Sequence, residues 1–133
     1  SHDEVVHGKA TIAQKMYGDY EMKFPQARAL YTYMYAHPGK KLNFMGNEFA
    51  NYDEWKHDRG INFMLLELDK HKQMHEFSKA LNNFYISNSE MYEIDYSWEG
   101  FKWLAADDRD NNIVAFERRN KKGDIGLRLA VIG

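Results

Sequence analysis

Apolar residues recur at helical spacing in two stretches of the chain. In the first stretch, residues 24–36, Pro25 suits the opening turn of a helix, because its missing N–H has no partner there anyway. His37-Pro38-Gly39 then ends the helix, since the residue before a proline is pushed out of the α region. Four apolar residues between these signals follow the spacing i, i+3, i+4, i+7 of one helix face: Ala27, Leu30, Tyr31 and Met34.

The second periodic stretch predicts a helix over residues 69–85. Asp69 is a suitable N-cap, and Asn88-Ser89 breaks the pattern. The apolar residues expected to share one face are Met74, Phe77, Leu81, Phe84 and Tyr85.

Strand patterns frame this helix on both sides. A short strand is expected at 40–45, followed by a long irregular segment at 47–62, and loops of that length usually have a function. After residue 89 the pattern changes to alternation and turn residues. Turns at 107–112 and 120–124 separate three expected strands, which form a β-meander: 101–105, 113–117 and 127–132. The fold class is therefore α+β, with a helical part at 1–88 and an all-β part at 89–133.

Composition excludes several classes of function. The net charge of −2 gives no electrostatic basis for binding nucleic acid or an anionic membrane. The chain has no cysteine, no apolar run that could span a bilayer and no signal pattern, which is compatible with the cytoplasmic location that we expect. At 133 residues it is too short for a complete eight-stranded β/α barrel, which needs roughly 250.

Three short strings carry a family resemblance. They are Ser1-His-Asp-Glu-Val-Val-His-Gly-Lys9, the stretch 36–49 (AHPGKKLNFMGNEF) and Trp55-Lys-His-Asp58. Together they closely resemble the C-terminal third of the bacterial glycogen (1,4-alpha-glucan) branching enzymes of the α-amylase family. The resemblance runs to about residue 120, and residues 125–133 depart from it. It implies that 1–88 is the tail of a (β/α)8 TIM barrel and that 89–133 is the truncated start of an antiparallel β-sandwich domain.

The resemblance also implies a chemistry. Cleavage of a glucan with retention needs a nucleophilic carboxylate and a carboxylic acid about 5 Å apart, and this family adds a third carboxylate that stabilises the transition state. Asp3 corresponds to that third carboxylate, and His2 to a residue that contacts a substrate hydroxyl. The other two carboxylates belong to barrel strands four and five, which are not in this sequence. We therefore expect the isolated chain to be inactive.

The complete enzyme implied by the resemblance transfers a cut α-1,4-glucan chain to a 6-hydroxyl in glycogen biosynthesis. It needs no cofactor or metal, and its partner is the α-glucan (amylose or glycogen). The alternative is a non-catalytic glucan-binding or structural module derived from such an enzyme. Self-association is also expected, because the helix faces and the edges of the 40–45 strand would lack the rest of the barrel.

The remaining candidates are less specific. Tyr52, Trp55 and Asp58 lie in the loop after the presumed eighth strand, where they either contact glucan or pack the loop against itself. Trp98 and Trp103 are expected in the core of the β region rather than on a sugar-binding surface.

Possible metal ligands are weaker still. His2, Asp3 and His7 form a poor zinc pattern, because a zinc site needs three or four converging ligands. His71 and His75 share a helix face, but the zinc-protease motif requires Glu directly after the first His, where this chain has Lys72. A solvated helix face is the favoured interpretation, and no metal site is predicted.

Overall fold

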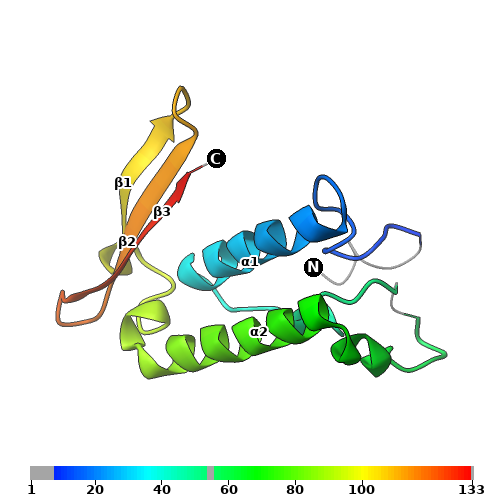
Figure 1. The fold of residues 1–133 in the computed structure, drawn as a ribbon. Coiled ribbons are helices and arrows are strands. Elements are labelled where there is room, and N and C mark those ends of the chain that lie inside the picture. Colours follow the sequence, from blue (N-terminus) through cyan, green and yellow to red (C-terminus); the bar gives the residue numbers. More distant parts are fainter. Residues whose placement is uncertain (1–7, 54–55, 133) are drawn as a thin grey trace. The chain divides into compact units, whose positions relative to one another are not determined.

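The computed structural model describes residues 8–53 and 56–132 (Figure 1). It confirms the α+β composition, with two helices and one antiparallel three-stranded sheet. The helices are α1 (Tyr20–Ala36) and α2 (Asp69–Ser87), and the strands are β1 (Phe101–Asp108), β2 (Ile113–Arg119) and β3 (Ile125–Ile132). Neither described helix combines the length and apolar character needed to cross a membrane.

The chain divides into two compact units. The helical unit comprises residues 1–30 and 42–80, and the sheet unit comprises 31–41 and 81–133. Each helix is shared, its first part belonging to the helical unit and its last part to the sheet unit. Neither unit begins or ends at residue 88. The division into domains 1–88 and 89–133 therefore stays a prediction.

Helix α1 begins four residues before the expected position. The cause is Asp19, whose carboxylate accepts a hydrogen bond from the backbone N–H of Met22 at 3.1 Å. This N-cap satisfies one of the otherwise unpaired first N–H groups. Pro25 consequently lies inside the helix, at an exposed position where water can pair with the carbonyl that its missing N–H leaves free. Of the predicted stripe, Ala27 and Tyr31 are buried, whereas Leu30 is 42% exposed.

Helix α2 buries only part of the predicted stripe, together with two polar residues. His71, Met74 and Ser78 are its buried residues, while Phe84 is 41% exposed. The interpretation of His71 as part of a solvated face was wrong. The spacing i, i+3, i+7 of the buried residues is helical, but two of the three are polar, so an apolar pattern could not identify them.

The strand predicted at 40–45 is not formed. These residues have no regular structure, and Leu42 and Met45 are 56% and 49% exposed. A strand needs a neighbour to pair with its N–H and C=O groups, and the three strands of the described chain pair only with one another. The described residues therefore do not test the barrel tail.

The sheet has the order β1-β2-β3, with β2 in the centre (Figure 1). Phe116 of β2 is fully buried, with Ala36 and Met91, at the centre of the core of the sheet unit. Trp103 contacts the Phe116 ring edge-on at 5.9 Å, yet it is 44% exposed and Trp98 is 82% exposed. The expectation that both tryptophans are core residues was therefore wrong. Trp103 lies on a sheet of three strands, which covers only part of its own surface, and Trp98 lies before that sheet, in the 3-10 helix Trp98–Gly100.

Candidate functional site

The predicted site residues are divided between described and undescribed parts of the chain. His2, Asp3, His7 and Trp55 lie outside the described residues. Tyr52 and Asp58 lie in the loop between two short 3-10 helices, Asn47–Phe49 and Phe63–Glu67. This loop belongs to the helical unit, and it is the part of the candidate site whose geometry can be described.

A glycine and a buried asparagine shape the start of this loop. Gly46 has φ +85°, and a Cβ there would lie 2.8 Å from Cβ of Asn51. The Asn51 N–H donates to the Gly46 carbonyl at 3.0 Å, closing a tight turn. Its side-chain amide donates to the Asp53 carbonyl at 2.6 Å, and its side-chain oxygen accepts from the Asp53 N–H. The side chain thus supplies the backbone pairing that a strand would otherwise provide.

Helix α2 holds the loop through its two buried polar residues. The Ser78 hydroxyl donates to the carbonyl of Glu48 at 2.8 Å. Nδ1 of His71 lies 2.9 Å from the carbonyl oxygen of Phe49. Because a carbonyl only accepts, His71 must carry its proton on Nδ1. Its Nε2 is buried, with no hydrogen-bond partner in the described part of the chain.

Tyr52 packs into an aromatic cluster formed by both helices. Its ring lies edge-on to His71 at 5.4 Å and to Tyr20 at 5.6 Å between centroids. It also stacks on Phe24 at 6.3 Å. Its hydroxyl is buried and has no hydrogen-bond partner among the described residues, and this burial raises the pKa of Tyr52, with the nearby Tyr20 adding to the effect. In this arrangement Tyr52 fixes the loop to the helices, and it presents no hydroxyl to solvent.

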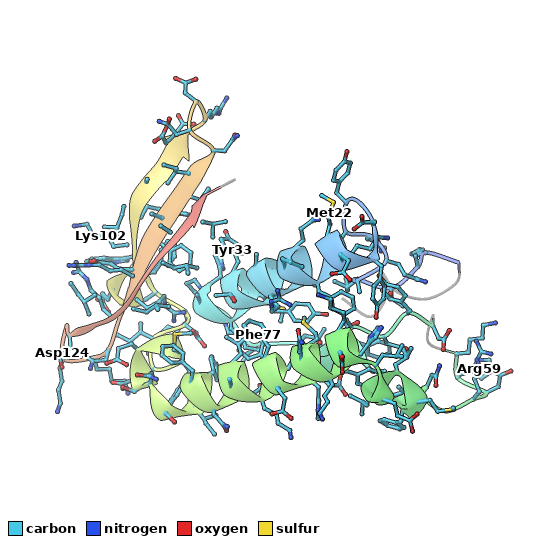
Figure 2. All side chains as sticks on the ribbon, viewed as in Figure 1. Met22, Tyr33, Arg59, Phe77, Lys102 and Asp124 are labelled. Atoms are coloured by element: carbon cyan, nitrogen blue, oxygen red, sulfur yellow. The ribbon has the colours of Figure 1, made fainter. Side chains whose placement is uncertain are left out.

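Asp58 lies apart from this cluster and is exposed. The same loop lines an open cavity of about 220 Å³, whose charged lining residues are Asp53, Lys56 and Arg59, with Asp58 not among them. One carboxylate oxygen of Asp53 accepts from the side chain of Asn62 at 2.8 Å. Arg59 lies in the same loop (Figure 2). The cavity therefore offers both donors and acceptors, which suits hydroxyl groups, and neither Asp58 nor Tyr52 is one of its lining residues.

Two further features bear on the chemistry of the site. Among residues 8–53 and 56–132, no group of three or more histidines and carboxylates could hold a metal ion. His71, in α2, holds the loop through the carbonyl of Phe49. Its burial was not predicted from the sequence. Its position three residues before Met74 puts it on the buried side of the helix, but a polar residue at that position gives no apolar signal.

Comparison with known proteins gives the family. No family model matches the chain. It is 49% identical over 122 residues to 1,4-alpha-glucan branching enzyme GlgB 1 of Clostridium perfringens strain SM101, an alignment covering 91% of this chain and 18% of that protein. It is 46% identical over 123 residues to each of the branching enzymes GlgB of Halothermothrix orenii and Aquifex aeolicus, with 92% of this chain and 20% of each protein aligned. The chain thus spans about a fifth of the length of the curated relatives it matches. By this similarity it belongs to the GlgB family of 1,4-alpha-glucan branching enzymes, of which it represents a segment.

Proposed function

We propose that this chain serves as part of a branching enzyme that cuts an α-1,4-glucan and transfers the cut chain to a 6-hydroxyl. The observation that carries the proposal is the 45–49% identity to branching enzymes over more than nine tenths of the chain. Amylose or glycogen would be the substrate, and the cytoplasm the compartment.

The finer architecture is part of this proposal. Residues 1–88 would form the last portion of a β/α barrel, with 40–45 as its eighth strand once neighbouring strands pair with it. Residues 89–133 would begin the β-sandwich domain. The exposure of Leu42 and Met45 supports this, because apolar side chains of a barrel strand need the rest of the barrel to cover them.

Two residues are assigned roles in the reaction. Asp3 would stabilise the positive charge that develops on the cleaved sugar, and His2 would hold one of its hydroxyls. The nucleophile and the acid/base would come from other parts of the enzyme. Trp55 and Asp58 remain predicted contacts to the glucan chain, and so does the half-buried ring of Tyr52, although its hydroxyl is buried.

A chimera tests the proposal. The matching segment of the Clostridium perfringens enzyme is replaced by this chain, and branching of amylose is measured by the loss of iodine staining. We expect activity in the chimera and none in the isolated chain. A folded chimera without branching activity, whose parent enzyme is active under the same conditions, would argue for the alternative of a non-catalytic glucan-binding or structural module.

A further inference from the structure

Ala50 has a left-handed backbone conformation at the point where the loop of the candidate site begins. Its φ is +57° and its ψ is +52°, a region that residues with a Cβ rarely adopt because the Cβ lies too close to the following carbonyl oxygen. The residue is also buried, with 1% of its surface exposed. A conformation of this kind persists only where the surrounding structure enforces it, so the neighbours of Ala50 must fix its backbone.

Helix α2 provides this restraint through the peptide group that joins Phe49 to Ala50. The carbonyl oxygen of that peptide accepts a hydrogen bond from Nδ1 of His71 at 2.9 Å. The preceding carbonyl, that of Glu48, accepts from the Ser78 hydroxyl at 2.8 Å. Because rotation of a peptide plane changes φ of the residue after it, a bond to the Phe49 carbonyl restrains φ of Ala50. His71 is therefore the side chain that opposes relaxation of Ala50 to a negative φ.

The ring of His71 is itself held in one orientation. The rings of Phe24, Tyr52 and Tyr20 lie 5.0, 5.4 and 5.8 Å from it between centroids, and only 1% of the residue is exposed. Packing on several sides restricts a side chain to one rotamer. Nδ1 consequently keeps its direction towards the Phe49 carbonyl.

The backbone angles of Ala50 determine where the following loop lies. The N–H of Asn51 donates to the carbonyl of Gly46 at 3.0 Å, and the Asn51 side chain bonds to the backbone of Asp53. These bonds form only if the chain turns at residue 50 as it does. The loop 51–62 carries Tyr52 and Asp58, two of the predicted glucan contacts, and small displacements of groups that position a substrate can slow a reaction strongly.

We infer that His71 is a positioning residue for the branching reaction, because its hydrogen bond to Phe49 holds Ala50 in the left-handed conformation and thereby directs the loop 51–62. His71 acts through the backbone of this loop and not on the substrate. The effect on the reaction rests on the proposed function, whereas the restraint of Ala50 rests on the structure of the helical unit alone.

Two polar substitutions separate the hydrogen bond from the polarity of the side chain. His71→Asn places an amide N–H where Nδ1 lies, whereas His71→Gln places its amide one bond further along the side chain. Hydrogen exchange by NMR in the 133-residue chain follows the N–H groups of Ala50 and Asn51, which bond to the carbonyls of Asn47 and Gly46. In His71→Gln both should exchange about tenfold faster, the scale of one buried hydrogen bond. His71→Asn should stay close to wild type.

Two controls show whether the effect is local. The amides of β2, in the sheet unit, should exchange at the wild-type rate in His71→Gln. His75→Gln makes the same substitution one turn along α2, at a half-buried position, and should leave Ala50 and Asn51 unchanged. Equal acceleration in β2, or equal effects of His71→Gln and His75→Gln, would contradict the inference.

A double variant tests the link to Ala50 directly. Glycine adopts positive φ without a steric penalty, so residue 50 needs less restraint in Ala50→Gly. The substitution His71→Gln should therefore accelerate exchange at Asn51 less in the Ala50→Gly background than in wild type. If His71→Gln alone does not fold, the double variant should fold, as judged by circular dichroism. Equal acceleration in both backgrounds, or a double variant that is also unfolded, would count against the role of His71.

Kinetics in the chimera with the Clostridium perfringens enzyme test the effect on the reaction. His71→Gln should raise KM for amylose about tenfold, while His71→Asn and His75→Gln should keep the wild-type KM. A purely stabilising role would lower the amount of folded enzyme, and hence the maximal rate, without changing KM. An unchanged KM in an active His71→Gln chimera would therefore overturn the inference.

The two proposals fail separately. An inactive wild-type chimera would refute the proposed function, and the exchange experiment on the 133-residue chain would still decide whether His71 restrains Ala50. An active chimera with unchanged exchange in His71→Gln would refute the role of His71 and leave the proposed function standing.

Discussion

Arg118 donates from Nη1 to the carbonyl oxygen of Ala36 at 2.7 Å, which joins the central strand of the sheet to the last residue of α1. The last carbonyls of a helix have no partner within it, so this arginine caps α1 from another element. The same guanidinium bonds to the carbonyls of Gly100 and Ile94 and forms an ion pair with Asp95. One side chain thus satisfies four polar groups of the sheet unit, one at the end of α1 and three in residues 94–100.

Arg118→Met should consequently destabilise the chain strongly. The substitution leaves three carbonyls and the carboxylate of Asp95 without their donor, and breaking a buried pair of this kind costs about 3–5 kcal/mol. The control is Arg109→Met, because Arg109 is 89% exposed in its ion pair with Asp107 and such pairs contribute about 0–1 kcal/mol. Urea denaturation followed by circular dichroism gives both values. Equal effects in the two variants would contradict the role assigned to Arg118.

Gly100 should be irreplaceable for a steric reason. A Cβ at this position would lie 2.4 Å from the carbonyl oxygen of Ile94 and 2.7 Å from its Cβ. Backbone cannot yield as a flexible side chain can, so Gly100→Ala should cost about 1–3 kcal/mol, the range of an overpacked core site. Gly60→Ala is the matched control, since nothing lies within 4 Å of its added Cβ. The difference in thermal denaturation midpoint measures the effect, and similar midpoints for the two variants would count against the close approach.

The helices and strands could be predicted from the sequence more accurately than the contacts between them. Local signals such as the turn at 120–124 sufficed to place β2 and β3, because they act between neighbouring residues. The 40–45 strand failed because strand formation depends on a partner far away in the sequence. His71 and Arg118 were missed for a related reason: a polar residue is buried only where distant carbonyls meet it, and no periodicity records that.

The candidate site shows the same limit. Tyr52 could be placed in a functional loop from the sequence, but whether its ring faces glucan or the helices could not be decided. The structure places the ring against Tyr20, Phe24 and His71. That arrangement depends on the tertiary packing of α1 and α2 rather than on the sequence of the loop.

Glu117 should make the stability of the chain sensitive to acid. Hydrogen bonds from Arg119, and secondarily from Arg128, its cross-strand neighbour, hold the pKa of Glu117 below its ordinary value. A carboxyl whose pKa is depressed on folding contributes stability above its unfolded pKa and loses it as the pH falls through the folded pKa.

The neutral variant Glu117→Gln isolates this contribution. At pH 7 it should be less stable than wild type, and the difference should shrink as the pH is lowered through the acid range. Urea midpoints at several pH values provide the measurement. A difference that stays constant with pH would show that the carboxylate charge is not involved.

The isolated chain should self-associate. Met64 and Phe63 are 73% and 61% exposed and adjacent in the helical unit, and exposed apolar groups of this size favour association. The double variant Phe63→Asp/Met64→Asp should reduce it, whereas Ile86→Asp, at a residue that is 66% exposed in the sheet unit, should reduce it less. Sedimentation velocity over a range of concentrations reports the outcome. A compact monomer at the highest concentration would contradict the prediction.

The role of Asp3 is best tested in the chimera, where the other two carboxylates of the reaction are present. A group that stabilises charge only in the transition state lowers kcat and kcat/KM together when it is removed. Asp3→Asn keeps the shape and removes the charge, and it should lower kcat by about a hundredfold or more, the scale for loss of one preorganised stabilising group. His2→Ala should cost less, because it removes a single hydroxyl contact and no charge. Arg109→Met, at an exposed position far along the sequence, is the control and should leave the initial rate of amylose branching unchanged. If Asp3→Asn retains near wild-type kcat, the correspondence of residues 1–9 with the family motif does not extend to the function of its carboxylate.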